Sequence, residues 1–391
     1  MPSVFPSSRT FETATHGLDG VLSDEERREV VEFALRSLDA THASREPDVD
    51  ALRGCPEVHG YDLERPFVLE DFVRSLSSTG FQASALGEAI AIVREMRDRQ
   101  VPLYLGITSN IGTCGLRDNL TYLVSHGHIR GLAATAGAIE EDVMKVLLPF
   151  VIGEYRADDR SLHRKSVCRT GNILIPGGRY TWLHLLLWTL HRRLKRAGLT
   201  QIGVVEYVRE MGRQLELLDI SGREGSFVYQ AWRMGIDIYC PAILDGAIGD
   251  AVYYARRRDA EFVMDVCRCH QQLIEHMMVA RSQAGALGIV ALGGSVAKHM
   301  LCNAAIFSGG AGYAVYINTA TEADGSNAGA TTSEAISWGK IREDARAVKV
   351  EAEATLVFPL LLAAAFQEYQ PKRPIENAQA ASSEEHERST S

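Results

Sequence analysis

The chain has 391 residues, of which 46% are hydrophobic and 23% charged, so it can form a large core and is not fibrous or largely disordered. With 41 basic and 50 acidic side chains the net charge is −9, without a strong Lys/Arg block, so nucleic acid is not expected as a partner. No apolar run reaches the ~20 residues of a membrane-spanning helix. The first residues lack the pattern of a secretory signal. Because the cysteines are odd in number, seven, and no such signal is present, we expect them to be reduced thiols. We therefore expect a cytoplasmic protein without membrane contact.

The N-terminal part, residues 1–75, is predicted to be a helical extension. Ser23 begins a capping box that ends at Glu26, with Leu22 as a possible hydrophobic staple. The helix that follows is expected to run to about Ala40. An ordered helix therefore precedes the main part of the chain.

From residue 100 onward the sequence predicts an α/β domain with a largely parallel sheet and helices on both faces. Short apolar runs alternate there with helical segments, which is typical of such a fold. The runs cover 101–108, 129–135, 236–243, 287–292, 313–317 and 347–350. Helical spacing is expected over 70–77, 83–97 and 180–217, the last with a break near 198–203. We place one domain at 76–370 and a disordered polar tail at 371–391.

Polar and glycine-rich loops follow the predicted strands, and parallel sheets bind ligands at such positions. The loops at 108–112 and 135–142 combine small residues, hydroxyls and acidic groups, which suits a dinucleotide. The G-x-G-x-x-G fingerprint is absent, so the loops alone leave a nucleotide site open. Because carboxyl ends of parallel strands share an edge, we expect five such loops to converge there.

The three later loops carry candidate catalytic side chains. Asp245 and Asp250 flank paired glycines, and this pattern also fits a glycine turn with a helix-capping aspartate. His299 follows a glycine-rich turn and by itself fits a structural role. Lys340 stands close to Trp338, where burial would lower its pKa and free the amine for nucleophilic attack. Taken alone, this lysine fits a surface cation better.

Two further clusters are interpreted as structural features without a catalytic or metal-binding role. Cys267, Cys269 and His270 with His276 lack the paired spacing of zinc sites, so no metal is predicted and core packing on a helix is preferred. The expected apolar stripe consists of Phe262, Val266, Cys267, His270, Leu273, Ile274, Met277 and Met278. The basic run 191–196 is expected to be a solvated helix end.

Seven motifs, in this order, resemble those of the deoxyhypusine synthase family. They are ITSNIGTCG, ATAGAIEED, GNILIPGGRY, CPAILDGAIGD, GGSVAKH, YAVYINTATEADGS and EAISWGKI, within residues 75–370. The resemblance implies a Rossmann-like fold and a homotetramer of tight dimers with active sites at the dimer interfaces. It also implies NAD-dependent transfer of the aminobutyl group of spermidine to one lysine of the eukaryotic translation initiation factor 5A precursor. The domain at 76–370 would be the NAD-binding catalytic domain.

The resemblance also implies roles for individual residues. Lys340 would form an imine with the aminobutyl group, and His299 would transfer protons. The positions that match NAD contacts are Ser109, Asn110, Thr135, Ala136, Gly137, Glu141, Asp245, Thr319, Ala320 and Asp324. The positions that match polyamine contacts are Glu140, Glu141, Asp250, His299, Gly325, Asn327, Glu334, Trp338 and Lys340. Carboxylates would bind the ammonium groups, and the tryptophan would add a cation–π contact.

The chain departs from the family pattern at several positions. Asn327 and Ala328 replace an aspartate and a serine, Ala138 replaces a glycine, and residues 111–114 differ from the common form. Loss of a charge-assisted contact at Asn327 would weaken polyamine binding by about 1.5–3 kcal/mol. Two alternatives therefore remain. One is a homospermidine synthase-like enzyme with putrescine as acceptor, and the other is a weakly active regulatory paralogue in a heterotetramer.

Overall fold

The computed structural model describes residues 21–39 and 54–367. The chain divides into two units, between Val58 and His59. The predicted tail at 371–391 lies outside the described residues. None of the described helices is both long and apolar enough to cross a membrane.

The first unit contains helix α2, Asp24–Asp39, which begins with the predicted capping box. The backbone N–H and the hydroxyl of Ser23 both donate to the Glu26 carboxylate at 2.8 Å. In return, the Glu26 N–H donates to Ser23 Oγ at 3.3 Å. These reciprocal bonds satisfy backbone donors that a helix start leaves free. The capping box is therefore confirmed.

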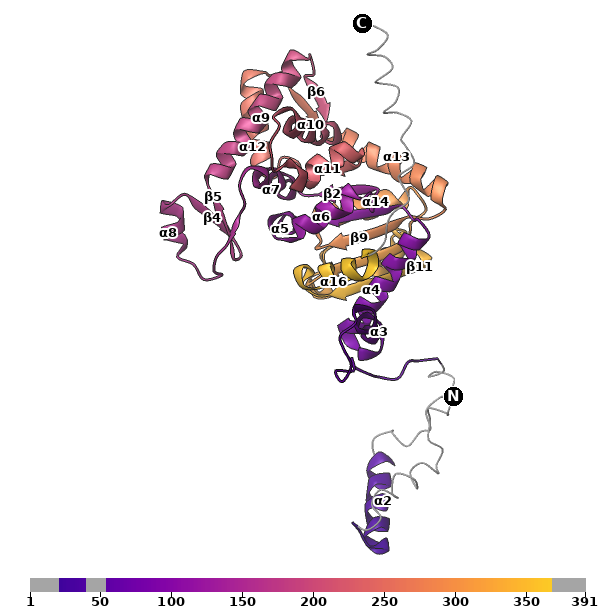
Figure 1. The fold of residues 1–391 in the computed structure, drawn as a ribbon. Coiled ribbons are helices and arrows are strands. Elements are labelled where there is room, and N and C mark those ends of the chain that lie inside the picture. Colours follow the sequence, from indigo (N-terminus) through magenta and orange to yellow (C-terminus); the bar gives the residue numbers. More distant parts are fainter. Residues whose placement is uncertain (1–20, 40–53, 368–391) are drawn as a thin grey trace. The chain divides into compact units, whose positions relative to one another are not determined.

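The second unit is built on a six-stranded sheet with the order β11-β10-β9-β1-β2-β7 (Figure 1). All neighbouring strands in it are parallel. The strands are β1 Leu103–Ile107, β2 Gly131–Ala134, β7 Asp237–Tyr239, β9 Gly288–Leu292, β10 Ala311–Asn318 and β11 Ile341–Glu351. They confirm the six predicted strands. Every residue of β1, β2 and β9 is buried, as expected for strands covered on both faces.

Helices pack on both faces of this sheet. A Cβ at Gly106 would lie 3.1 Å from Leu301 Cδ1 of α14, whereas one at Gly288 would clash with the Met96 sulfur of α4. Gly288 pairs with Leu103, three positions before Gly106, so the two glycines face opposite sides. The helices of this unit are α3 Leu69–Thr79, α4 Phe81–Asp98, α5 Ser109–Thr113, α6 Leu116–Ser125, α7 Ala136–Leu147, α8 Asp159–Arg164, α9 Gly178–Arg196, α10 Val204–Leu217, η1 Arg223–Gly225, α11 Phe227–Met234, α12 Ala247–Arg258, α13 Val266–Ala284, α14 Ser295–Ile306, η2 Glu322–Asp324, α15 Thr332–Ser337 and α16 Ala354–Phe366.

Two small sheets were not predicted. Strands β3 Val151–Ile152, β4 Val167–Thr170 and β5 Ile173–Pro176 form an antiparallel sheet, which lies with α8 at the left of Figure 1. Strands β6 Gln201–Gly203 and β8 Val263–Asp265 form a parallel pair. The predicted helix break near 198–203 is confirmed, because β6 separates α9 from α10.

The core face of α13 differs from the predicted stripe. The buried residues of this helix are Cys269, Leu273, Met277 and Ala280. Cys267 is exposed, so the expected inward position of this cysteine was wrong. His276 Nδ1 lies 2.8 Å from the Tyr239 hydroxyl, which gives this histidine a packing role beside β7. No group of three or more metal-binding side chains lies together in the described part of the chain.

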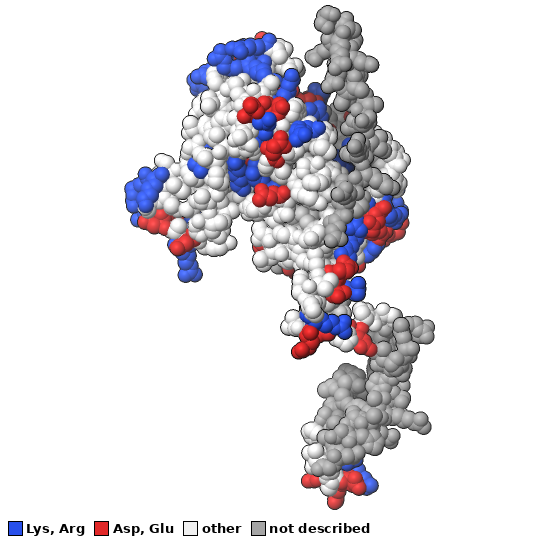
Figure 2. All heavy atoms as spheres, in the orientation of Figure 1, with Lys and Arg blue, Asp and Glu red and all other residues white. Residues whose placement is uncertain are grey.

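Basic side chains gather at the ends of two neighbouring helices. The last turn of α9 carries Arg193, Lys195 and Arg196, and that of α12 carries residues 256–258. Figure 2 shows Lys and Arg clustered over the region of α9 and β6. Positive charge at a helix carboxyl end is favourable, so this surface fits the predicted solvated helix end.

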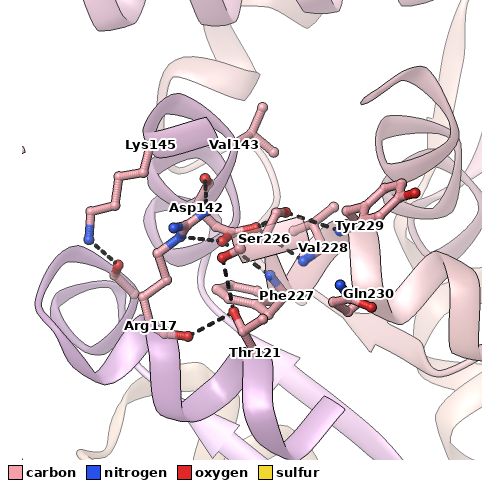
Figure 3. Close-up of polar contacts among 12 residues, drawn as sticks. Arg117, Thr121, Asp142, Val143, Lys145, Ser226, Phe227, Val228, Tyr229 and Gln230 are labelled. Atoms are coloured by element: carbon pink, nitrogen blue, oxygen red, sulfur yellow. Dashed lines mark hydrogen bonds and ion pairs between the residues drawn. The ribbon is translucent and has the colours of Figure 1, made fainter. Parts of the chain in front are cut away.

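Asp142 of α7 is the centre of a buried polar network (Figure 3). Its carboxylate accepts hydrogen bonds from Arg117 Nε at 2.6 Å, from the Ser226 hydroxyl, and from the backbone N–H groups of Phe227 and Val228. The Asp142 side chain is fully buried, and that of Arg117 is 11% exposed. One carboxylate thus joins α6 and α7 to the start of α11.

We expect Asp142→Asn to lower the free energy of unfolding by about 3–5 kcal/mol, because it leaves the buried Arg117 charge unpaired. Urea unfolding followed by circular dichroism measures this change. Asp344→Asn is the control, because Asp344 pairs with Arg342 on the surface and is 70% exposed. Equal stability of the two variants would contradict a central role for Asp142.

Candidate active site

A pocket of about 160 Å³ lies between α14 and the segment that joins β10 to β11. The predicted site residues that line it are His299, Gly325, Asn327, Glu334, Trp338 and Lys340. Its other lining residues are Lys298, Cys302, Tyr316, Ala330, Thr331 and Ala335. The structure therefore brings the candidate nucleophile, the candidate proton carrier and an aromatic side chain to one cavity.

The backbone of Lys340 does not lie at the carboxyl edge of the sheet, where the loops after the other strands begin. Its carbonyl accepts a hydrogen bond from Ala311 N, the first residue of β10, and β11 begins at the next residue, Ile341. The lysine therefore precedes the strand, while the loops after β1, β2, β7 and β9 follow theirs. The Lys340 backbone therefore lies away from the edge where five loops were expected to converge, because α15 precedes the start of β11. The Lys340 side chain nevertheless shares its pocket with residues that follow β9 and β10, among them His299 and Asn327.

The Lys340 side chain is only partly buried within one chain. Its Nζ lies 5.5 Å from the centroid of the Trp338 ring, within the range of a cation–π contact. Trp338 itself is 65% exposed, and Glu334 is exposed as well. The burial expected around a nucleophilic amine is therefore incomplete in a single chain.

His299 lines the same pocket from α14. Partial desolvation, together with the positive charges of Lys340 and Lys298, lowers the pKa of its imidazole. A neutral imidazole can accept a proton, which is the state a general base requires. The pocket is thus lined both by Lys340 and by an imidazole whose neutral form is favoured.

The predicted NAD residues lie at the carboxyl edge of the sheet, after several strands. Ser109 follows β1 and Thr135 follows the neighbouring β2, and their hydroxyl oxygens lie 2.7 Å apart. A Cβ at Gly137 would lie 2.5 Å from Ser109 Oγ, so this position requires glycine. The remaining members of the set are Asn110 after β1, Ala136 at the start of α7, Asp245 after β7, and Thr319, Ala320 and Asp324 after β10.

Glu140 is buried and caps a neighbouring helix. Its Oε2 accepts a hydrogen bond from Ile248 N at 3.0 Å, in the first turn of α12. Desolvation raises the pKa of Glu140, and the negative charges of Asp250 and Asp245 add to this effect. The expected aspartate cap before α12 was therefore wrong, because a glutamate from α7 provides the cap.

Glu141 points from α7 toward the loop after β1. Its carboxylate accepts a hydrogen bond from the Thr113 hydroxyl, and desolvation raises its pKa to about 7. Lys145, one turn further along α7, donates to the carbonyl oxygens of Gly112 at 2.9 Å and Cys114 at 3.3 Å. Helix α7 thus holds the β1 loop through both a carboxylate and an ammonium group.

The acidic cluster and the lysine pocket are separate within one chain. Glu140, Glu141, Asp245 and Asp250 gather around α7 and α12, and none of them lines the pocket of Lys340. Of the carboxylates predicted to bind a polyamine, only that of Glu334 lines the Lys340 pocket. The predicted polyamine contacts therefore form two separate groups within one chain.

Lys298 and Tyr316 were missed by the sequence analysis. Lys298 is 2% exposed, and its Nζ lies 4.1 Å from the Tyr316 ring centroid. A signal was available, because Leu301 and Cys302 follow it at positions i+3 and i+4 on the buried face of α14. That spacing indicates a buried lysine.

A parallel sheet with helices on both faces and a pocket lined by polar side chains are typical of an α/β enzyme. The chain belongs to the deoxyhypusine synthase family, because residues 71–365 match the family model described as Deoxyhypusine synthase. It is therefore an enzyme of the transferase class.

Relatives agree with this assignment. A probable deoxyhypusine synthase from Pyrococcus furiosus is 37% identical over 81% of this chain and 97% of its own length. One from Halobacterium salinarum is 38% identical over 84% of this chain and 98% of its own length. The fold resembles a crystal structure assigned as a deoxyhypusine synthase from Entamoeba histolytica, with a TM-score of 0.56 at 24% identity, over 81% of this chain and 99% of that one.

The raised pKa of Glu141 predicts a pH-dependent stability. Because the folded state holds this proton more tightly than the unfolded state, the contribution is present at low pH and lost as pH rises through about 7. We expect it to amount to at most about 3 kcal/mol between pH 4 and 8. Glu141→Gln should remove that part of the pH dependence in urea unfolding, whereas the exposed control Glu64→Gln should retain it. An unaltered pH profile in Glu141→Gln would contradict the assignment.

Proposed function

We propose that the protein is a deoxyhypusine synthase in the strict sense. It would use NAD to transfer the aminobutyl group of spermidine, through an imine on Lys340, to a lysine of the eukaryotic translation initiation factor 5A precursor. The single observation that carries this proposal is the pocket that holds Lys340, His299, Glu334 and Trp338 together. Family membership over most of the chain supports the same reaction.

The residues at the carboxyl edge fit a dinucleotide. Thr135 precedes α7, and its carbonyl accepts a hydrogen bond from Ala138 N at 3.1 Å, but its side chain caps no N–H group of the first turn. The N–H groups of Ala136 and Gly137 could therefore bind a phosphate. Gly137 lets Ser109 pack against the start of α7, because a Cβ at residue 137 would lie 2.5 Å from Ser109 Oγ. Ser109, Asn110, Thr135–Gly137, Glu141, Asp245, Thr319, Ala320 and Asp324 would hold NAD. When bound, NAD would accept a hydride from the amine and return it at the end of the reaction.

The residues of the pocket would carry out proton transfer, nucleophilic attack and binding of the ammonium groups. His299 would take the proton that the amine loses, and the Lys340 amine would attack the oxidised carbon and release diaminopropane. The substrate lysine would then displace Lys340 from the imine. Glu334 and Trp338 would bind an ammonium group of spermidine, with Gly325 and Asn327 beside them.

A second copy of the chain would complete the site. The acidic cluster of Glu140, Glu141 and Asp250 is absent from the lysine pocket, and the exposed Trp338 leaves that pocket open. Dimer interfaces that join the two parts would provide enough carboxylates for a tricationic amine. We therefore propose a homotetramer of two dimers, with residues 76–370 as its catalytic domain, 1–75 as an extension and 371–391 as a tail, in the cytoplasm.

One observation favours a second candidate. Asn327 lines the pocket where the family has an aspartate, and its Nδ2 donates to the Ser295 carbonyl at 3.3 Å. A site with one carboxylate fewer would suit a weakly active regulatory paralogue that works in a heterotetramer. An acceptor such as putrescine, as in a homospermidine synthase-like enzyme, would use the same pocket.

One assay separates these candidates. The purified protein is incubated with NAD and spermidine, with and without the factor 5A precursor, and diaminopropane release and the precursor mass are measured. Release with a mass gain on the precursor supports the proposal. Release without the mass gain indicates another acceptor, and no release despite bound NAD indicates a regulatory subunit.

We expect Lys340→Ala to reduce aminobutyl transfer by at least about 10⁴-fold, as for removal of nucleophiles in other covalent enzymes. NAD binding, measured by calorimetry, should be largely unchanged, because Lys340 is not among the predicted NAD contacts. Lys165→Ala, at an exposed lysine, is the control. Normal transfer by Lys340→Ala would remove this lysine as the nucleophile.

Asn327→Asp should strengthen spermidine binding. An added charge-assisted hydrogen bond is worth about 1.5–3 kcal/mol, so the KM for spermidine should fall about 10- to 100-fold. Ala328→Ser is the matched control, because it restores the neighbouring family residue without adding charge. An unchanged KM in Asn327→Asp would show that residue 327 does not face an ammonium group.

A further inference from the structure

Residues 319–331, the site segment, join β10 to α15 and carry four lining residues of the pocket, Gly325, Asn327, Ala330 and Thr331. Many of the hydrogen bonds of this segment are local. Ser326 N donates to Asp324 Oδ1 at 2.8 Å, and Gly329 N donates to the Ser326 carbonyl at 3.1 Å. Local bonds give the segment a shape but do not fix its position on the sheet.

Lys298 binds the site segment from α14. Its Nζ donates to the carbonyl oxygens of Asn327 at 2.8 Å and Ala330 at 3.1 Å, and it lies over the Tyr316 ring. An ammonium group has three N–H donors, and two carbonyls and one ring face match that number. None of the ion pairs in the described part of the chain includes Lys298. The Lys298 ammonium group therefore interacts with two backbone carbonyls and the Tyr316 ring.

Lys349 binds the same segment from β11. Its Nζ donates to the carbonyl oxygens of Ala320 and Gly329, both at 2.8 Å. Its side chain is 6% exposed, and Glu351 lies 3.2 Å away as a partly exposed counter-charge. Backbone carbonyls outside a helix or sheet need such donors when they are buried. Two lysines from two elements therefore hold the segment at four carbonyls.

Lys298 binds the part of the segment that lines the pocket, and Lys349 binds Ala320 and Gly329, which are not lining residues. Asn327, whose carbonyl Lys298 binds, is also the residue whose side chain lines the cavity. Close packing supports this placement, because a Cβ at Gly294 would lie 2.6 Å from the Ala328 Cα. Loss of either ammonium would free the segment next to Lys340.

We propose that Lys298 and Lys349 are positioning residues: together they fix the site segment against α14 and β11, so that Asn327 and Gly325 face the amine of Lys340. They act on the backbone of the segment and need not touch the substrate. The catalytic part of this inference rests on the proposed function. The structural part does not.

Hydrogen–deuterium exchange of the full-length protein tests the structural part. Lys298→Met and Lys349→Met keep the length of the side chain but remove its donors, and Lys165→Met is the exposed control. Amides of residues 319–331 should exchange at least about tenfold faster in either variant, as expected for loss of hydrogen bonds to a charged group. Amides of β1 and β9 should keep their rates. Unchanged exchange of the segment in both variants would overturn the proposal.

Kinetics test the catalytic part in the same variants. We expect kcat for diaminopropane release to fall at least about tenfold in both variants. The Kd for NAD should change less in Lys298→Met than in Lys349→Met, because Lys349 binds the carbonyl of Ala320, a predicted NAD contact. Faster exchange with an unchanged kcat would overturn the positioning role. If the unaltered protein releases no diaminopropane, the proposed function fails, while exchange still decides whether the lysines hold the segment. If one variant does not fold, the other decides, because each lysine binds its own pair of carbonyls.

Discussion

Three consecutive carboxylates on α7 bind three different segments of the chain. Successive residues of a helix point about 100° apart, so neighbours in sequence reach different parts of the fold. Glu140 caps α12, Glu141 binds Thr113 after β1, and Asp142 joins Arg117 to the start of α11. All three are buried, so each must keep its partners. The position of α7 therefore determines how the carboxyl edge of the sheet is arranged.

The main sheet could be predicted because its strands are buried on both faces. Such strands are apolar at nearly every position, as in the run that contains β9, Gly288–Leu292. The small sheets gave no such signal, since β3, Val151–Ile152, is exposed and has only two residues. On α13 the helix was predictable but its core face was not. Apolar residues such as Val266 and Met278 lie on its exposed side, and the neighbours that select the buried side are distant in sequence.

The candidate site was predictable in its chemistry and less so in its geometry. Motifs after the strands and before β11 marked six of the twelve residues that line the pocket, including His299 and Lys340. Their relative placement depends on the path of α15, for which the sequence carries no simple pattern. The cap on α12 could not be predicted from the local sequence, because Glu140 lies more than a hundred residues before the helix that it caps. Long-range partners of this kind follow only from the packed fold.

The contact between α5 and α7 links two positions that depart from the common family form. A Cβ at Gly112 would lie 2.8 Å from the Ala138 Cα and 3.0 Å from its Cβ. The extra methyl group at residue 138 is accommodated because residue 112 has no side chain. The two residues share one small volume, so neither can grow unless the other shrinks. Across relatives, these positions should covary, with a side chain at one and glycine at the other.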